Sequence, residues 1–310
     1  MESLSPPEAL RGGMIIDSHV HIWQRDMYPD VIMDAYLEPL LLLDALYFKQ
    51  GPPDEKDWLK SETGATELVG DMQVAKIDKS VILPLDFGLV GPTKKGVEEF
   101  NDWVFESCSP YPDKLIPFVG VDPQRGRLAL SIVEKHAKRH DARGVKVYPP
   151  TGWRPNEERI RPFWKLVDDL GLMVVSHSGA VWGPLDEEAS RPSYYADVLE
   201  KHHNLKLVIA HMGGKFREEL PPLVHKFENV YTDCSALQGW LPSNPEMVMS
   251  RLKEITELLP DRVFFGTDWP LFELAYSNPY FVELVRDGKW GSEEQKERLF
   301  GGNFLRALKK

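Results

Sequence analysis

Short apolar runs alternate with helical segments along most of the chain, and this alternation limits the fold more than any other feature of the sequence. Runs rich in β-branched residues predict strands near residues 14–20 and at Lys79–Leu85, Leu115–Val121, Arg143–Tyr148, Leu172–His177, Lys206–His211, Val230–Cys234 and Arg262–Asp268. Apolar residues at helical spacing predict helices at Thr66–Ile77, Lys94–Cys108, Gly126–His140, Asn156–Leu170, Ser193–His203, Lys215–Phe227 (broken near Pro221–Pro222) and Glu246–Leu259, with more helix ending near Lys309.

Eight strand–helix units whose strands are apolar on both faces favour an α/β fold with a buried parallel sheet. The most economical arrangement is a (β/α)8 TIM barrel with an insertion after strand 1. An open doubly wound sheet is the alternative. It is disfavoured because no glycine-rich phosphate loop follows an early strand.

The length of 310 residues suits a single barrel domain with insertions. Residues 1–12 are polar and contain proline, which predicts a loose N-terminal arm. Residues 24–63 are the longest irregular segment, and we expect them to cover the barrel mouth or to form an interface. Pro39 is expected to interrupt any long helix there, and the patch Leu40–Leu43 is compatible with a homodimer contact.

Composition excludes several classes of protein. The net charge of -11 disfavours a nucleic-acid partner, and no apolar run approaches the ~20 residues of a membrane span. The first residues lack the apolar core of a signal peptide, and two cysteines cannot form a disulfide framework. We therefore expect a cytoplasmic protein that acts on a small molecule without nucleic-acid or membrane partners.

The segment MIIDSHVHIW (Met14–Trp23) places two histidines at the end of the first strand. Because side chains alternate along a strand, His19 and His21 project from one face while Val20 points to the other. Two imidazoles on one face are suited to binding a metal ion. The pair alone is equally compatible with two surface histidines on an edge strand.

Other polar residues at predicted strand ends decide between these interpretations. His177, His211, Lys146, Asp233 and Asp268 all lie at or just beyond a strand end, and a barrel brings such ends to one mouth. Neutral imidazoles and a carboxylate bind Zn²⁺, Mn²⁺ or Fe²⁺. We expect one divalent cation, Zn²⁺ first, held by His19, His21, His177 and Asp268. His211 is the expected acid–base residue, because imidazole titrates near neutral pH.

Aromatic residues also gather just after predicted strands. An aromatic wall at the mouth is therefore expected, and the candidate substrate-binding residues are Trp23, Tyr148, Trp182 and Trp269. Basic residues in the loops after strands could hold a carboxylate, although each is individually expected to be a solvated charge: Arg154, Arg191, Lys215 and Arg217.

Six motifs together resemble the amidohydrolase superfamily, specifically the group that includes aminocarboxymuconate-semialdehyde decarboxylase, γ-resorcylate decarboxylase and lactone hydrolases. They are IDSHVHIW (Ile16–Trp23), GVKVYPP (Gly144–Pro150), VVSHSG (Val174–Gly179), LVIAHMGG (Leu207–Gly214), VYTDCSA (Val230–Ala236) and FFGTDWP (Phe264–Pro270). The resemblance implies a TIM barrel with the metal ligands named above. It implies that His211 polarises substrate or moves protons, and that Asp268 accepts a proton from metal-bound water.

The resemblance leaves the role of Lys146 open. Some superfamily members carry a carbamylated lysine at this place that bridges two metals, and Lys146 is a candidate for that second-metal role or for substrate binding. The group that this chain most resembles usually uses one metal, so we expect a plain ammonium that pairs with a carboxylate or a substrate anion.

Two reactions suit this set of residues. In hydrolysis, metal-bound water attacks an ester, lactone or amide carbonyl. In non-oxidative decarboxylation, the cation holds a carboxylate beside a carbon that is protonated as CO₂ leaves. We expect a hydrolase, because the segment after His177 (SGAVWGPLDEEASRP) lacks the long apolar stretch associated with the decarboxylases. A decarboxylase of an aromatic or muconate-type acid is the alternative, and a binding protein with a structural metal is the non-enzymatic one.

Overall fold

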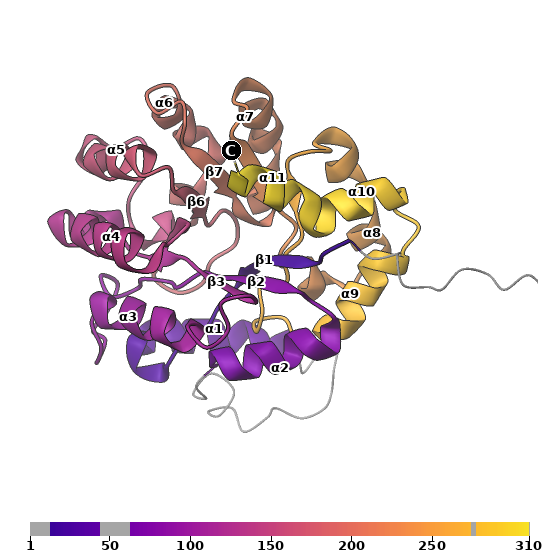
Figure 1. The fold of residues 1–310 in the computed structure, drawn as a ribbon, viewed down its shortest axis with the longest axis horizontal. Helices are drawn as coiled ribbons and strands as arrows, with labels where there is room; N and C mark the ends of the chain where they lie inside the picture. The colour runs from indigo at the N-terminus through magenta and orange to yellow at the C-terminus, as the bar shows by residue number, and fades with distance from the viewer. Residues whose placement is uncertain (1–12, 44–62, 274–276, 310) are drawn as a thin grey trace, which may run out of the picture.

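The computed structural model describes residues 13–43, 63–273 and 277–309 of the chain. Within these residues, parallel strands form a central ring that helices surround (Figure 1). The strands are β1 (Ile16–Val20), β2 (Lys79–Ile82), β3 (Leu115–Pro117), β4 (Val119–Gly120), β5 (Gly144–Val147), β6 (Met173–Ser176), β7 (Lys206–Ile209), β8 (Val230–Asp233) and β9 (Val263–Phe264). The predicted (β/α)8 barrel is confirmed, with one predicted strand divided at Phe118 into β3 and β4.

The hydrogen-bond ladder of the ring is interrupted at two seams. It consists of one sheet in the order β1-β2-β3 and a second in the order β4-β5-β6-β7-β8-β9. At the first seam the amide of Phe118 donates to the carbonyl of Ile82 at 2.9 Å. At the second seam, the amide of Ser18 donates to the carbonyl of Phe265 at 2.9 Å, and the amide of His21 donates to the carbonyl of Trp269 at 2.8 Å. The end of the ring therefore lies beside its beginning.

Helices follow the strands as the sequence predicts, with some differences in length. They are α1 (Asp30–Leu43), α2 (Ala65–Ala75), α3 (Val97–Cys108), α4 (Arg127–His140), α5 (Arg161–Asp169), α6 (Ala196–Leu199), α7 (Leu220–Lys226), α8 (Pro245–Leu258), α9 (Asn278–Asp287), α10 (Glu293–Glu297) and α11 (Asn303–Lys309). The largest difference is at Ser193–His203, where a 3-10 turn at Pro192–Tyr195 leaves only the short α6 as α-helix.

Two expectations about proline were wrong. Pro221 and Pro222 do not break a helix; they occupy the first turn of α7, where the missing amide hydrogen would have no intrahelical partner anyway. Helix α1 continues through Pro39 to Leu43. The expected arm at residues 1–12, the rest of the insertion at 44–62 and the side chains of the patch Leu40–Leu43 lie outside the described residues.

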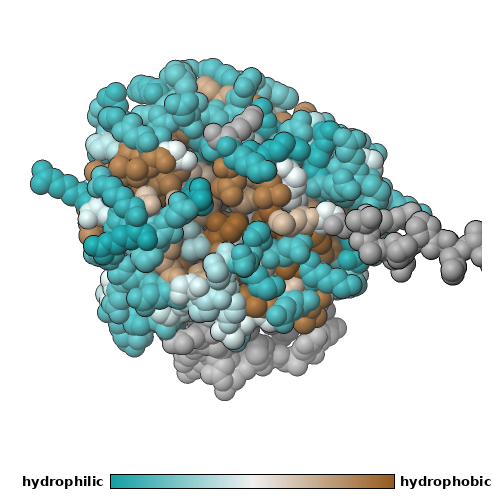
Figure 2. Space-filling view, viewed as in Figure 1, coloured by the Kyte–Doolittle hydropathy of each residue, from teal (hydrophilic) through white to brown (hydrophobic). Residues whose placement is uncertain are grey.

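The two ends of the barrel interior differ in chemistry. At the amino end of the strands the interior is apolar, and helix α11 packs Phe304 and Ala307 against it, together with Ile16, Val81, Phe118, Met173, Val208, Tyr231 and Phe264. Figure 1 shows α11 lying across the middle of the ring, and Figure 2 shows hydrophobic residues gathered near the middle of the same face, with hydrophilic residues around them. The polar interior is therefore at the carboxyl end.

No helix among the described residues combines the length and apolar character needed to cross a lipid bilayer.

Candidate metal centre and active site

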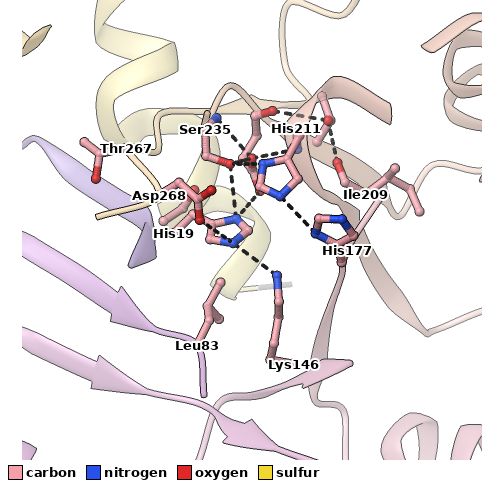
Figure 3. A network of polar contacts seen from close by, with 12 residues as sticks. His19, Leu83, Lys146, His177, Ile209, His211, Ser235, Thr267 and Asp268 are labelled. Atoms are coloured by element: carbon pink, nitrogen blue, oxygen red, sulfur yellow. Dashed lines mark hydrogen bonds and ion pairs between the residues drawn. The ribbon is translucent and has the colours of Figure 1, made fainter. Parts of the chain in front are cut away.

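Side-chain alternation along the strands delivers the polar residues to one end of the barrel. Met173 and Val175 of β6 face the interior, so His177, two residues further on, is expected on the same side. On β8 Tyr231 also faces the interior, so Asp233, two residues further on, is expected on that side as well. Figure 3 shows the result, with His19, Lys146, His177, His211 and Asp268 converging from separate strands and loops.

His19, His21 and Asp268 form one group of potential metal ligands. One donor atom from each lies within 4.8 Å of the other two, and all three residues are buried. The Oδ1 atom of Asp268 is 3.0 Å from His21 Nε2 and 3.5 Å from His19 Nε2. The amide of Asp268 donates to the carbonyl of His19 at 2.9 Å, which holds Asp268 in a left-handed conformation with φ 65°.

Hydrogen bonds on the far side of each ring fix which nitrogen faces the group. His21 Nδ1 donates to the carbonyl of Leu83 at 2.6 Å, and His19 Nδ1 donates to Asp233 Oδ2 at 3.0 Å. In these tautomers both Nε2 atoms carry lone pairs, so His21 Nε2 and the Asp268 carboxylate are two acceptors facing each other at 3.0 Å. A cation that both atoms ligate removes this repulsion, so the donor set fits a divalent metal ion.

A chain of hydrogen bonds that starts at Asp233 also fixes the tautomer of His177. The Ser235 hydroxyl donates to Asp233, so its oxygen accepts from His211 Nδ1 at 2.7 Å. The remaining lone pair of His211, on Nε2, then accepts from His177 Nδ1 at 3.2 Å. This leaves the lone pair of His177 on Nε2, a buried atom without a hydrogen-bond partner among the described residues. His177 lies outside the three-residue group, but its orphaned nitrogen suits the predicted ligand role.

Glycines in the motifs allow the loops that carry these histidines to approach one another. His211 lies in a left-handed turn, with φ 57°, that continues through Gly214. A Cβ atom added to Gly214 would stand 2.3 Å from the Cα atom of Gly179, in the loop after His177. Since any larger residue would separate these loops, the glycines of HSG and HMGG set the contact between His177 and His211.

Lys146 enters the same cluster from β5. Its side chain is 1% exposed, and its Nζ atom lies 3.1 Å from His19 Nε2. Among the described residues, no carboxylate lies within ion-pair distance of this nitrogen. Burial lowers the pKa of the ammonium to about 8, although the charges of Asp233 and Asp268 oppose the shift.

The electrostatics of the cluster favour neutral imidazoles at His19, His177 and His211 and ionised carboxylates at Asp233 and Asp268. Burial lowers the pKa of His19 to about 3, with a contribution from the charge of Lys146, and burial also lowers the pKa values of His177 and His211. Burial alone would raise the pKa of Asp268, but the polar groups around it, with His21 the nearest, hold it well below its usual range. These are the protonation states that metal ligation requires.

A sequence profile of the amidohydrolase family matches residues 16–309, which is nearly the whole chain. The chain belongs to the amidohydrolase family. The motif-based resemblance is therefore confirmed at the level of the family.

Individual relatives are more distant. A 2-amino-3-carboxymuconate-6-semialdehyde decarboxylase of Dictyostelium discoideum is 32% identical over 127 residues, which span 37% of this chain and only about a third (34%) of that protein. An uncharacterized TIM-barrel protein of Bordetella bronchiseptica superposes with a TM-score of 0.67 at 20% identity, covering 96% of this chain and 98% of that one. A 5-carboxyvanillate decarboxylase of Novosphingobium aromaticivorans, solved with manganese and 4-hydroxy-3-methoxy-5-nitrobenzoic acid, has a TM-score of 0.67 at 18% identity, covering 97% of each chain. At these identities the two solved structures show the shared fold.

The predicted substrate-binding aromatics of this amidohydrolase occupy different places. Tyr148 stacks on His177 with ring centroids 4.3 Å apart, and Trp182 packs edge-on against Tyr36 at 4.9 Å. The buried Trp23 packs against Tyr28, and Trp269 is buried beside Asp268. Of these four side chains, Tyr148 is therefore the one whose ring stacks on a histidine of the cluster.

The basic residues proposed for carboxylate binding are engaged elsewhere. Each of them pairs with a nearby acidic residue at the surface: Arg154 with Asp186, Arg191 with Glu188 and Glu219, Lys215 with Glu187, and Arg217 with Glu218. Lys146 is the cation that the structure places in the cluster.

Sequence reasoning missed two kinds of residue. The sequence indicates Asp233 only as a polar strand end and does not single out Ser235, although both lie in the motif VYTDCSA and together orient His19 and His211. Tyr36 was also missed. It lies on α1 in the insertion, and its hydroxyl is 2.6 Å from that of Tyr148. Nothing in the local sequence around Tyr36 indicates that it reaches the site.

Proposed function

We propose that this amidohydrolase is a metal-dependent, non-oxidative decarboxylase of a small, flat carboxylic acid with an aromatic or similarly unsaturated framework. The sequence analysis favoured hydrolysis, but the relatives support the decarboxylase alternative better. The relative from Dictyostelium discoideum and the solved structure from Novosphingobium aromaticivorans are both named as decarboxylases.

The observation that carries the proposal is the environment of Lys146. A buried ammonium without an ionic partner is unfavourable, since it has lost its hydration without gaining an opposite charge. Among the described residues Lys146 is in this position, directly beside the candidate metal donors. A substrate carboxylate placed between the metal and Lys146 would neutralise the ammonium, so the site selects an anionic substrate.

The metal ion belongs in the group of His19, His21 and Asp268, with the orphaned Nε2 of His177 as a further donor. The donor set suits Zn²⁺, our first choice, and also Mn²⁺ or Fe²⁺. When bound, the cation supplies positive charge that binds and polarises a substrate oxygen.

The remaining residues orient the substrate and handle a proton. The ring of Tyr148 offers a flat apolar surface against which an unsaturated framework packs. In the reaction the carbon–carbon bond to the carboxylate breaks, its electron pair stays on the ring carbon, a proton is added there and CO₂ leaves. We assign the delivery of this proton to His211: its Nε2 atom takes up a proton from solvent and gives it to the ring carbon, while Nδ1 remains bonded to Ser235 and, through it, to Asp233.

The test is a panel of hydroxybenzoates, benzene dicarboxylates and unsaturated dicarboxylates, incubated with the metal-loaded protein in D₂O. We expect release of CO₂ and one deuterium at the carbon that carried the carboxylate. Cleavage of aryl esters or lactones without release of CO₂ from any acid would contradict the proposal and restore hydrolysis. A mass increase matching a carboxyl group on Lys146 would show that the lysine is carbamylated and does not bind substrate.

A further inference from the structure

Helix α1 of the insertion contributes a side chain to the candidate active site. Tyr36 lies near the middle of α1, and its hydroxyl is 2.6 Å from the hydroxyl of Tyr148, which follows β5. Tyr148 in turn stacks on His177, with an interplanar angle of 24°. The insertion is thus connected to a candidate metal ligand through the side chains of Tyr36 and Tyr148.

Aromatic rings from separate elements surround this hydroxyl pair. Phe87, which follows β2, packs edge-on against Tyr148 at 5.0 Å, and Trp182, which follows β6, packs edge-on against Tyr36 at 4.9 Å. The pair therefore lies in a largely apolar setting, where a hydrogen bond is stronger than in water and an unpaired polar group is more costly.

The chemistry of a hydroxyl pair leaves one proton unused. A phenol has an ordinary pKa near 10, so both hydroxyls are neutral near pH 7. In a pair, one hydroxyl donates to the other, and the second keeps a proton for a third group. Either hydroxyl can be the donor, and donation from Tyr36 to Tyr148 would polarise the Tyr148 hydroxyl and strengthen the bond that it can donate.

We propose that the Tyr36–Tyr148 pair selects substrates that carry a second oxygen substituent near the reacting carboxylate. Tyr148 donates a hydrogen bond to that oxygen, and Tyr36 is a positioning residue that orients the Tyr148 proton. Tyr148 is assigned to the substrate because it is the member that contacts His177. This inference rests on the proposed function for the identity of the carboxylate substrate, and it adds a recognition element from the insertion.

The experiment measures binding of 2-hydroxybenzoate and benzoate to the metal-loaded protein by calorimetry. The variants are Tyr36→Phe, Tyr148→Phe and the double variant, each checked for an unchanged melting temperature. The second oxygen of 2-hydroxybenzoate is an uncharged hydroxyl, so Tyr148→Phe is expected to weaken 2-hydroxybenzoate binding by about 2- to 10-fold, the usual range for a hydrogen bond between neutral groups. Tyr36→Phe should weaken it less, and benzoate affinity should change little in either.

Tyr111→Phe is the matched control, because its hydroxyl bonds to Thr66 at the surface. If the pair acts as one unit, the double variant will bind 2-hydroxybenzoate as weakly as Tyr148→Phe alone. Equal losses for both ligands would show that the tyrosines only support the packing, and unchanged affinities would show that the pair does not contact the ligand. Either result overturns the inference. Since binding is measured without turnover, a failed decarboxylase assay remains a separate result.

Discussion

The two ends of the barrel interior use the same strands for opposite purposes. At the amino end the inward side chains are apolar and α11 packs over them, with Phe264 against Tyr231 and Phe304 at ring-centroid distances of 5.2 and 5.4 Å. At the carboxyl end the inward side chains are histidines, carboxylates and a lysine, several with unsatisfied or repelling atoms. One end is arranged for stability, and the other retains unfavourable interactions that a metal ion and an anion would relieve.

The largest effect should come from removing a donor at the polar end. His21→Ala deletes one of the three grouped ligands, so metal content and turnover should fall together, turnover by more than about 10²-fold. Elemental analysis and the CO₂ assay measure both. His202→Ala, a variant of a histidine that lies near Asp168 outside the cluster, is the control. Full metal content in His21→Ala would contradict its assignment.

Removing a side chain from the apolar end should lower the stability of the protein without lowering its metal content. Phe264→Ala leaves a cavity beneath α11 and should lower the free energy of unfolding by about 3–5 kcal/mol, while the folded protein keeps its metal. Denaturant unfolding measures the loss. Leu128→Ala, at a residue that is 42% exposed, should change stability by less than about 0.5 kcal/mol. If Phe264→Ala lost metal without losing stability, the division between the two ends would be wrong.

Lys146 allows the comparison to be tested within the polar end. Lys146→Met replaces a buried ammonium, which has no carboxylate partner among the described residues, with an apolar chain of similar length. The variant should gain about 1–2 kcal/mol of stability in the metal-free state and lose turnover, since the substrate carboxylate loses its partner. Chemical denaturation and the CO₂ assay measure the two effects. A variant that is both less stable and fully active would show that Lys146 has a structural role.

The smallest effect concerns the segment that follows Asp268. Burial, together with the charge of Asp71, raises the pKa of Glu273 from its ordinary value near 4.5 to about 7, and the amide of Asn278 donates to this carboxyl at 3.0 Å. A pKa that is higher in the folded state favours folding at low pH, so this contribution is complete below about pH 4.5 and disappears as the pH rises through 7. Glu273→Gln should therefore melt at a higher temperature than the parent at pH 8 and at a similar temperature at pH 4.5. A parallel pH profile for both proteins would disprove the linkage.

The sequence predicted the polar end well where a residue's position follows from strand periodicity. His19, His21, His177, Lys146 and Asp268 all lie at strand ends, and a barrel topology is enough to bring them together. The tautomers could not be predicted, because they depend on partners such as Leu83 and Ser235, which lie just beyond the ends of other strands.

Contacts from outside the strand–helix pattern were also beyond the sequence. Tyr36 reaches Tyr148 only because α1 folds over the mouth, and no periodicity fixes the path of an insertion. Pro221 and Pro222 show a different limit: proline starts a helix as readily as it ends one, and the surrounding turn decides which.

The most direct test of the account is the metal content of the purified protein, measured by elemental analysis before and after chelation together with the CO₂ assay. The account predicts about one divalent cation per chain, loss of decarboxylation when it is removed, and recovery when it is restored. Close to two cations would instead indicate a carbamylated Lys146 that bridges them. Decarboxylation that persists in fully metal-free protein would contradict the central claim that His19, His21 and Asp268 hold a catalytic metal ion.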